Sequence, residues 1–171
     1  MRILTKNLLS AALCAALATA SVGAAAAVLT GKVIRVADGD TITVRDEAGR
    51  KHRVRLQGID APEKQQRFGQ ACKRSLTEKV IGEIVTVEYE DEDRYGRILG
   101  TVYFGERNLN LEQVEEGCAW FYRYYAKDIP EDLAQAYYEA EVEATASEEG
   151  LWQQRDPTPP WEFRREQRRR N

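Results

Sequence analysis

The sequence has few of the residues that most metal and nucleophile chemistry requires. Its 171 residues include one histidine and three cysteines. His52 alone cannot build a histidine-rich zinc site. No serine lies in a Gly-x-Ser-x-Gly pattern, and no glycine-rich phosphate-binding motif occurs. The sequence therefore gives no support to a serine hydrolase triad or a glycine-rich nucleotide-binding loop.

The composition is that of one soluble globular domain. Hydrophobic residues make up 43% of the chain, charged residues 31% and aromatic residues 9%. A chain with this hydrophobic and aromatic content is too apolar to be disordered. The sequence also has no collagen-like glycine period and no internal repeat. We expect a single core.

Residues 1–26 are predicted to be a signal peptide. Arg2 and Lys6 precede an apolar run over residues 8–20, which ends in small residues. An uncleaved membrane anchor is the alternative, but the run is short and alanine-rich. Without a twin-arginine pair, the general secretory route is expected. We therefore expect a secreted or periplasmic monomer with no stable membrane association after cleavage.

The remaining chain is acidic. Removal of Arg2 and Lys6 with the signal leaves 23 basic and 28 acidic residues, a net charge of −5. This balance argues against a protein that holds nucleic acid by bulk charge alone. Residues 156–171, rich in proline and arginine, are the basic exception. They are predicted to be a disordered tail, with a phosphate-binding arm as the alternative.

Cys72 and Cys118 are the two cysteines that follow the predicted signal. A single pair in an exported chain could form one disulfide. Spacing alone leaves a second alternative open, two buried free thiols.

The order of predicted elements indicates a mainly β, α+β fold. Helices are predicted over residues 68–80, 109–116 and 130–150. Short β-branched segments bounded by turn residues predict five strands, near residues 33–36, 41–44, 53–57, 84–89 and 98–103. Five strands and about three helices, with one helix between the third and fourth strands, predict a five-stranded OB-type Greek-key barrel over residues 27–155.

Carboxylates are predicted to gather at one end of this barrel. Hairpin pairing of the second and third strands places Asp40 beside Asp60, with Arg55 near the same end. Glu63 follows Asp60 by three positions, and Asp38 lies close without binding a metal itself. Taken one at a time, each of these acidic residues could simply be a turn residue without a role in a site. Together they would repel one another without a cation, and oxygen ligands suit a hard divalent ion.

Three motifs resemble those of the thermonuclease family, the staphylococcal-nuclease-like domains. They are Val-Ala-Asp-Gly-Asp-Thr at residues 36–41, Val-Arg-Leu-Gln-Gly-Ile-Asp-Ala-Pro-Glu at 54–63 and Asp-Arg-Tyr-Gly-Arg at 93–97. The resemblance covers about residues 28–152. Their order and spacing are specific, whereas a lone Asp-Gly-Asp would be weak evidence.

The resemblance implies a metal site and a general base. Asp40 and Asp60 match carboxylates that hold one Ca²⁺, with the main-chain carbonyl of Ala61 as a further ligand. Glu63 matches the acid that acts on the attacking water, as general base or orienter. In the family, the reaction is endonucleolytic hydrolysis of DNA and RNA at the P–O5′ bond, leaving 3′-phosphate ends.

The resemblance also implies the substrate-binding residues. Arg55 and Arg97 match the arginines that bind the phosphate, a task that suits a planar guanidinium. Arg94 belongs to the same third motif and is expected to bind substrate. Tyrosines after the fifth strand pack on the nucleotide in the family, and Tyr125 is the first choice here, with Tyr124 in reserve.

Two other functions stay open on the sequence. One is a non-catalytic OB-type module that binds nucleic acid, and the other is a scaffold protein stabilised by calcium. The retained acids and arginines favour the nuclease over both. No residue is predicted to recognise a base edge, so little sequence specificity is expected.

Overall fold

The computed structural model describes residues 27–170. The predicted signal peptide, residues 1–26, lies outside the described residues. Within residues 27–170, no helix combines the length and apolar character needed to cross a membrane.

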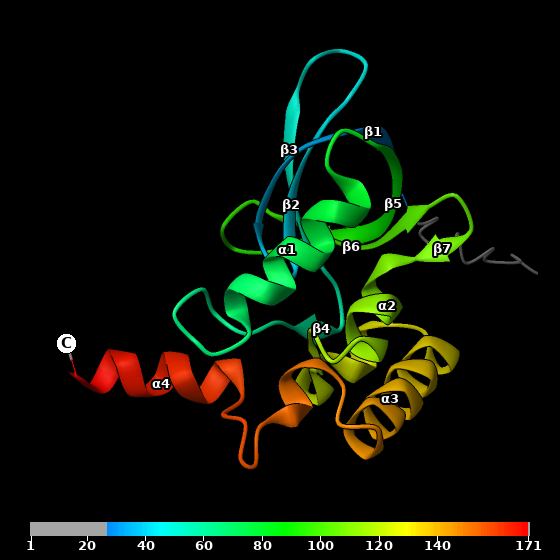
Figure 1. Ribbon diagram of the computed structural model, residues 1–171. Helices are drawn as coiled ribbons and strands as arrows, with labels where there is room; N and C mark the ends of the chain where they lie inside the picture. Colours follow the sequence, from blue (N-terminus) through cyan, green and yellow to red (C-terminus); the bar gives the residue numbers. More distant parts are fainter. Residues whose placement is uncertain (1–26, 171) are drawn as a thin grey trace, which may run out of the picture.

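Five strands close into a barrel (Figure 1). Hydrogen bonding follows the order β3-β2-β1-β5-β6, and parallel pairing of β3 with β6 closes the ring. The predicted five-stranded OB-type barrel is therefore confirmed. Its strands are β1 (Ala27–Asp38), β2 (Thr41–Arg45), β3 (Lys51–Leu56), β5 (Ile84–Glu92) and β6 (Ile98–Phe104). Three two-residue strands accompany them, β4 (Ile59–Asp60), β7 (Arg107–Asn108) and β8 (Trp120–Phe121).

Alternating β-branched residues fill the barrel. Val44, Val54, Val87 and Val102 are fully buried, and burying such a side chain contributes about 1.5–3 kcal/mol. β1 extends well beyond the four residues predicted, because its first half pairs with β5 and its second half with β2. One long bent strand thus joins both sides of the barrel.

The β2–β3 hairpin has a register slightly different from the prediction. Arg55 lies opposite Thr41, one or two residues from the expected position. The cause is the turn, in which the Asp46 carboxylate accepts the Arg50 N–H at 2.8 Å. The shift brings Arg55 to the start of β2, next to Asp40.

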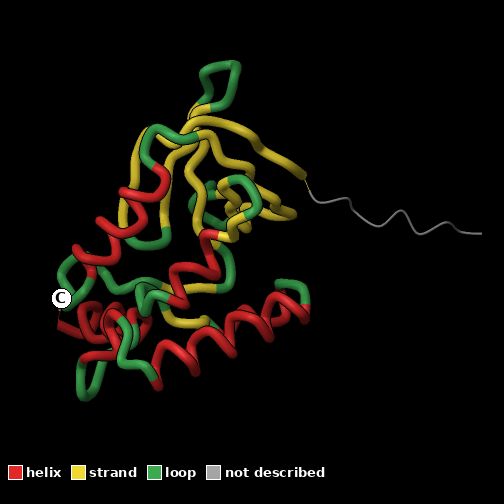
Figure 2. The backbone as a smooth tube through the Cα atoms, turned by 45° about the vertical axis from the view of Figure 1, so that its right-hand side comes forward, coloured by secondary structure: helices red, strands yellow, loops and turns green. Residues whose placement is uncertain are grey.

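Helices gather around the lower part of the barrel (Figure 2). α1 (Gly69–Val80), α2 (Leu109–Glu115) and α3 (Glu131–Ala146) correspond to the three predicted helices. Tyr137 of α3 is fully buried and meets Phe121 edge-on, with 6.1 Å between ring centroids. Two 3-10 helices, η1 (Arg123–Asp128) and η2 (Gly150–Gln153), complete the connections.

The C-terminal segment is not a disordered tail. It forms α4 (Pro160–Arg170), which projects from the body below the loop that leads to α1 (Figure 1). Pro160 suits the first helical position because its ring presets φ. Trp161 stacks on Tyr122 at 5.0 Å with an interplanar angle of 9° and meets Trp120 edge-on. This aromatic contact supplies the tertiary packing that the sequence pattern did not reveal.

Cys72 of α1 and Cys118 are buried free thiols. The expected disulfide is therefore absent from this structure, which has the alternative arrangement. A hydrogen bond with Cys118, together with burial, raises the pKa of the Cys72 thiol well above its usual value.

Candidate active site

One cleft of about 750 Å³ collects most of the predicted site residues. It opens at the end of the barrel where β2 begins and where β3 and β4 end, and η1, α4 and the turn between β5 and β6 form its other walls. The predicted residues that line it are Asp40, Arg55, Asp60, Ala61, Glu63, Arg94, Arg97 and Tyr125. Tyr124 is not among the lining residues.

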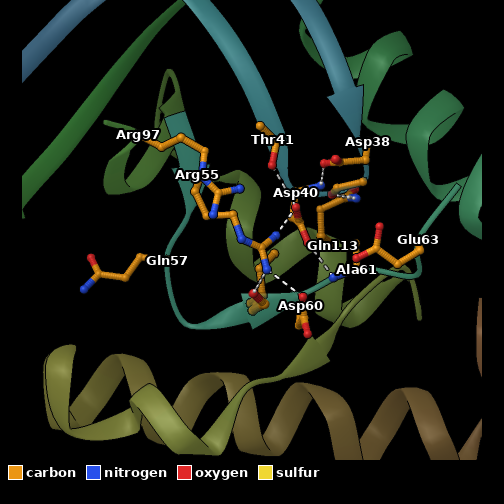
Figure 3. Close-up of polar contacts among 12 residues, drawn as sticks. Asp38, Asp40, Thr41, Arg55, Gln57, Asp60, Ala61, Glu63, Arg97 and Gln113 are labelled. Atoms are coloured by element: carbon orange, nitrogen blue, oxygen red, sulfur yellow. Dashed lines mark hydrogen bonds and ion pairs between the residues drawn. The ribbon is translucent and has the colours of Figure 1, made fainter. Parts of the chain in front are cut away.

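Arg55 lies between the two buried aspartates (Figure 3). Its Nη1 pairs with Asp40 Oδ1, and its Nη2 lies 2.6 Å from Asp60 Oδ1. The side chain of Arg55 is 14% exposed, and those of Asp40 and Asp60 are 5% and 1% exposed. Buried carboxylates need such a partner because desolvation of an unpaired charge is costly.

The backbone fixes both aspartates. Asp40 Oδ2 accepts the Ala61 N–H at 2.6 Å, which ties the start of β2 to the residue after β4. Asp60 is paired with Trp120 in the β4–β8 ladder. Gly39 allows this close approach, because a Cβ there would lie 2.8 Å from the Cβ of Ala61.

The donor set fits a hard divalent cation. Asp40 and Asp60 offer only oxygen ligands, the chemistry that calcium prefers, and calcium commonly completes its shell with carbonyl groups and water. Ala61 lines the same cleft, where its carbonyl could add a ligand. No group of three or more His, Cys, Asp or Glu side chains within residues 27–170 is arranged as a metal centre. In the structure, arginines neutralise the aspartates instead.

Glu63 begins the loop that leads to α1. Its N–H donates to Gln66 Oε1 and its carbonyl accepts the Gln66 N–H, both at 2.8 Å. Its carboxylate pairs with Arg164 of α4 at 2.9 Å. With a side chain 33% exposed, Glu63 can reach both the cleft and solvent.

Arg164 is a site residue that was not predicted from the sequence. Its Nη2 lies 2.8 Å from Asp60 Oδ2, and its Nη1 lies 2.9 Å from Glu63 Oε1. Partial burial works against its charge, but hydrogen bonds and the negative charges of Asp60 and Glu63 raise the pKa of Arg164. Arg164 therefore joins Arg55, Arg94, Arg97 and Arg168 among the arginines that line the cleft.

Arg97 is oriented by Asp93. Its Nε and Nη2 lie 2.7 Å and 2.6 Å from Asp93 Oδ2, and Asp93 Oδ1 accepts the Arg97 N–H. Although burial opposes it, these bonds from Arg97 lower the pKa of the Asp93 carboxyl. Nη1 of Arg97 stays outside this ion pair and is free to bind a phosphate oxygen.

Replacement of Asp93 by asparagine should lower kcat/KM for nucleic acid cleavage by about 10-fold. The neutral amide keeps the turn but loses the charge-assisted bond that orients Arg97, a bond worth about 1.5–3 kcal/mol. Steady-state kinetics measure the loss. Asp91→Asn, at an exposed position two residues earlier, is the matched control. An unchanged kcat/KM for Asp93→Asn would show that Arg97 needs no such support.

Tyrosines of the segment after β8 form the aromatic wall. Tyr125, the first choice from the sequence, lines the cleft and is 44% exposed, whereas Tyr124 is 73% exposed. Tyr122 also lines the cleft, although it was not predicted. Burial and the negative charge of Asp60 raise the pKa of Tyr122. The tyrosines at positions 122, 124 and 125 were the sequence feature that could have pointed to Tyr122.

Two buried amides also escaped prediction. Gln113 of α2 donates to the Gly39 carbonyl at 2.8 Å and so holds the turn that carries Asp40. Asn110 donates to the carbonyls of Gln57 and Gly100. Both side chains are fully buried. Polar side chains on the buried face of a helix need hydrogen-bond partners, and this was the sequence feature that could have pointed to them.

One family model and several known proteins are similar to this chain. A family model described as staphylococcal nuclease homologue matches residues 53–154. An uncharacterized endonuclease of Escherichia coli is 44% identical over 135 residues, which cover 78% of this chain and 84% of that protein. A micrococcal nuclease of Shigella flexneri is 40% identical over 144 residues, covering 79% and 80%.

A third relative, an uncharacterized endonuclease of Haemophilus influenzae, is 38% identical over 139 residues, which cover 81% of this chain and 75% of that protein. The family match runs from β3 to the end of η2 and includes Arg55, Asp60, Glu63 and Arg97. The chain is therefore a nuclease, a phosphodiester hydrolase, and it belongs to the staphylococcal nuclease homologue family.

Proposed function

We propose that the protein is an exported, calcium-dependent endonuclease that cuts DNA and RNA without sequence preference and leaves 3′-phosphate ends. The observation that carries this proposal is the cleft itself. Two buried carboxylates, a half-buried glutamate and five arginines are among the residues that line one cavity. Such a set provides cation ligands, a proton acceptor and donors for phosphate oxygens.

Each group has a task in the proposed reaction. Asp40, Asp60 and the Ala61 carbonyl would hold the calcium ion. The positive charge of the ion would offset the negative charge of the phosphate. Arg97 presents Nη1 to a phosphate oxygen while Asp93 holds its other nitrogens. Arg55, which lines the same cavity, is the second donor. Donors fixed before the reaction stabilise charge that develops on the phosphorus oxygens.

Hydrolysis adds water across the P–O5′ bond. Glu63 accepts one proton from the attacking water, whose oxygen forms the new bond to phosphorus. The bond from phosphorus to O5′ breaks, and O5′ leaves as a hydroxyl after taking a proton from solvent. The products are a 3′-phosphate end and a 5′-hydroxyl end. None of the lining groups is arranged as a base-edge reader, which supports the absence of sequence preference.

A cleavage assay with defined metals tests the proposal. The purified protein is incubated with single-stranded DNA, double-stranded DNA and RNA in calcium, in magnesium and in chelator, beside an Arg97→Ala variant. We expect cutting in calcium only, its loss in the variant, and 3′-phosphate ends by mass spectrometry. Cutting in chelator would contradict the calcium requirement. Binding of nucleic acid without cutting in any metal would contradict the enzymatic function.

Export is proposed from the sequence alone. Arg2 and Lys6 before the apolar run 8–20 support a cleaved signal. Expression of the full chain in a bacterial host, followed by fractionation and mass measurement, tests it. We expect the protein outside the cytoplasm with its N-terminus near Ala27. Uncleaved protein in the cytoplasm would overturn the proposal.

A further inference from the structure

We propose that α4 is a binding surface for the nucleic acid strand that extends the active-site cleft, and that its arginines contact phosphates beyond the scissile one. The inference rests on the proposed function, because it concerns the substrate of the same cleft. It assigns a role to a segment that the nuclease motifs do not include, since these end at residue 97 and the family match ends at residue 154.

The charge of α4 contrasts with the rest of the chain. The whole sequence has a net charge of −3, whereas the 11 residues of α4 hold five arginines and two glutamates. The arginines are Arg164, Arg165, Arg168, Arg169 and Arg170. A concentrated basic face on an acidic protein attracts a polyanion at one place.

The first turns of α4 are joined to the cleft. Trp161 stacks on Tyr122, a cleft residue, and Pro160 is buried. Gln66, from the loop after Glu63, donates to the Thr158 carbonyl at 2.9 Å. These contacts fix the helix axis relative to the site. Figure 1 shows the C-terminal end of α4 pointing away from the barrel.

Two arginines of α4 lie one after the other along the helix, from the cleft outward. Arg164 lies inside the cleft on Asp60 and Glu63. Arg168, one helical turn further, lines both the cleft and a neighbouring hollow of about 380 Å³. Residues four apart lie on one face of a helix, so both side chains project from the same face. At 1.5 Å per residue, α4 spans about 16 Å. That length matches about four or five phosphates of one strand.

Continuity with the cleft favours a nucleic acid as the occupant. Arg168 lines the cavity that also contains Arg55 and Arg97. A strand with its scissile phosphate in the cleft therefore meets Arg168 next. Arginines 168–170 are exposed and available for such contacts.

The test removes three charges at the outer end of α4. In one variant, Arg168, Arg169 and Arg170 are each replaced by glutamine, a good helix former. The matched control replaces Arg45, Arg50 and Lys51 by glutamine. These are exposed residues at the tip of the β2–β3 hairpin, at the opposite end of the molecule from α4 (Figure 1). Circular dichroism checks that helix content is retained.

Cleavage is measured on single strands of about 20 and about 4 nucleotides over a range of salt concentrations. For the long strand, we expect the α4 variant to lose about 10- to 100-fold in kcat/KM at low salt. The slope of log kcat/KM against log salt should fall by about two, since each phosphate contact on a single strand contributes about 0.7. Cleavage of the short strand should fall by less than that of the long strand, because the short strand can reach Arg168 at the cleft but ends before Arg169 and Arg170.

The outcomes separate this inference from the proposed function. An α4 variant that matches the control variant on the long strand, in both rate and salt slope, would overturn the inference even though the protein cuts. The same would follow from faster cleavage by the α4 variant, which would make α4 an obstacle to the substrate. If the wild-type protein cuts nothing, fluorescence anisotropy of the long strand in chelator still measures the salt slope. An equal slope for both variants would then overturn the inference as well.

Discussion

Replacement of Glu63 by glutamine is expected to lower kcat by about 10²- to 10⁴-fold with little change in KM. The amide keeps the size of the side chain but cannot accept a proton from the attacking water, and general-base catalysis contributes an effect of that size. Arg164 keeps its two contacts with Asp60, so folding should be little affected. Single-turnover cleavage in calcium measures the chemical step directly.

Glu78→Gln is the matched control for Glu63→Gln. Glu78 is exposed on α1 and is not among the residues that line the cleft. The Glu78→Gln variant loses the same negative charge as Glu63→Gln and should cut at the wild-type rate. A kcat for Glu63→Gln within about 3-fold of wild type would assign the proton transfer to another group. A change confined to KM would make Glu63 a binding residue.

Replacement of Arg55 by alanine should affect both activity and stability. Loss of a preorganised donor lowers kcat by about 10²- to 10³-fold. In chelator, removal of the partner from two buried carboxylates should lower the free energy of unfolding by about 3–5 kcal/mol. Urea unfolding in chelator, with and without added calcium, provides the measurement. Calcium should stabilise the variant more than wild type, because no guanidinium competes for Asp40 and Asp60.

Arg55→Lys serves as the comparison. An ammonium keeps the charge near Asp40 and Asp60 but cannot bridge both with a planar fork. We expect most of the stability to return and most of the activity to stay lost. Should Arg55→Ala be too unstable to purify, the lysine variant still tests the site through calcium-dependent unfolding. Equal stabilisation of wild type and the variants by calcium would contradict a cation site on these aspartates.

Turn chemistry and strand alternation determined the barrel and the inner part of the site. Asp38, Asp40, Arg55, Asp60 and Glu63 lie within 26 residues of one another along a hairpin and the loop that follows it. Local pairing therefore brings them to one end of the sheet, and the prediction of their proximity needed no distant contact. The exact register depended on the Asp46–Arg50 turn, where one side-chain hydrogen bond set which residues face each other.

Contacts between distant segments could not be predicted in this way. Arg164 meets Asp60 across 104 residues, and Gln113 meets Gly39 across 74. No periodic pattern encodes such pairs. The arginine-rich end of the chain was predicted to be disordered because its charge repels and its apolar content is low. Stacking of Trp161 on Tyr122 supplies the missing packing, and that aromatic surface exists only in the folded protein.

The sequence by itself determined the family, the five-stranded barrel, and the set of carboxylates and arginines around Asp40, Asp60 and Arg97. Alternation, turn residues and short-range spacing express these features directly. Only the tertiary structure decided which arginines neutralise the acids, that Tyr122 lines the cleft, that Cys72 and Cys118 are free thiols, and that α4 forms a wall of the site. Each of these depends on packing between segments far apart in the chain, where side-chain shape and desolvation decide the contact.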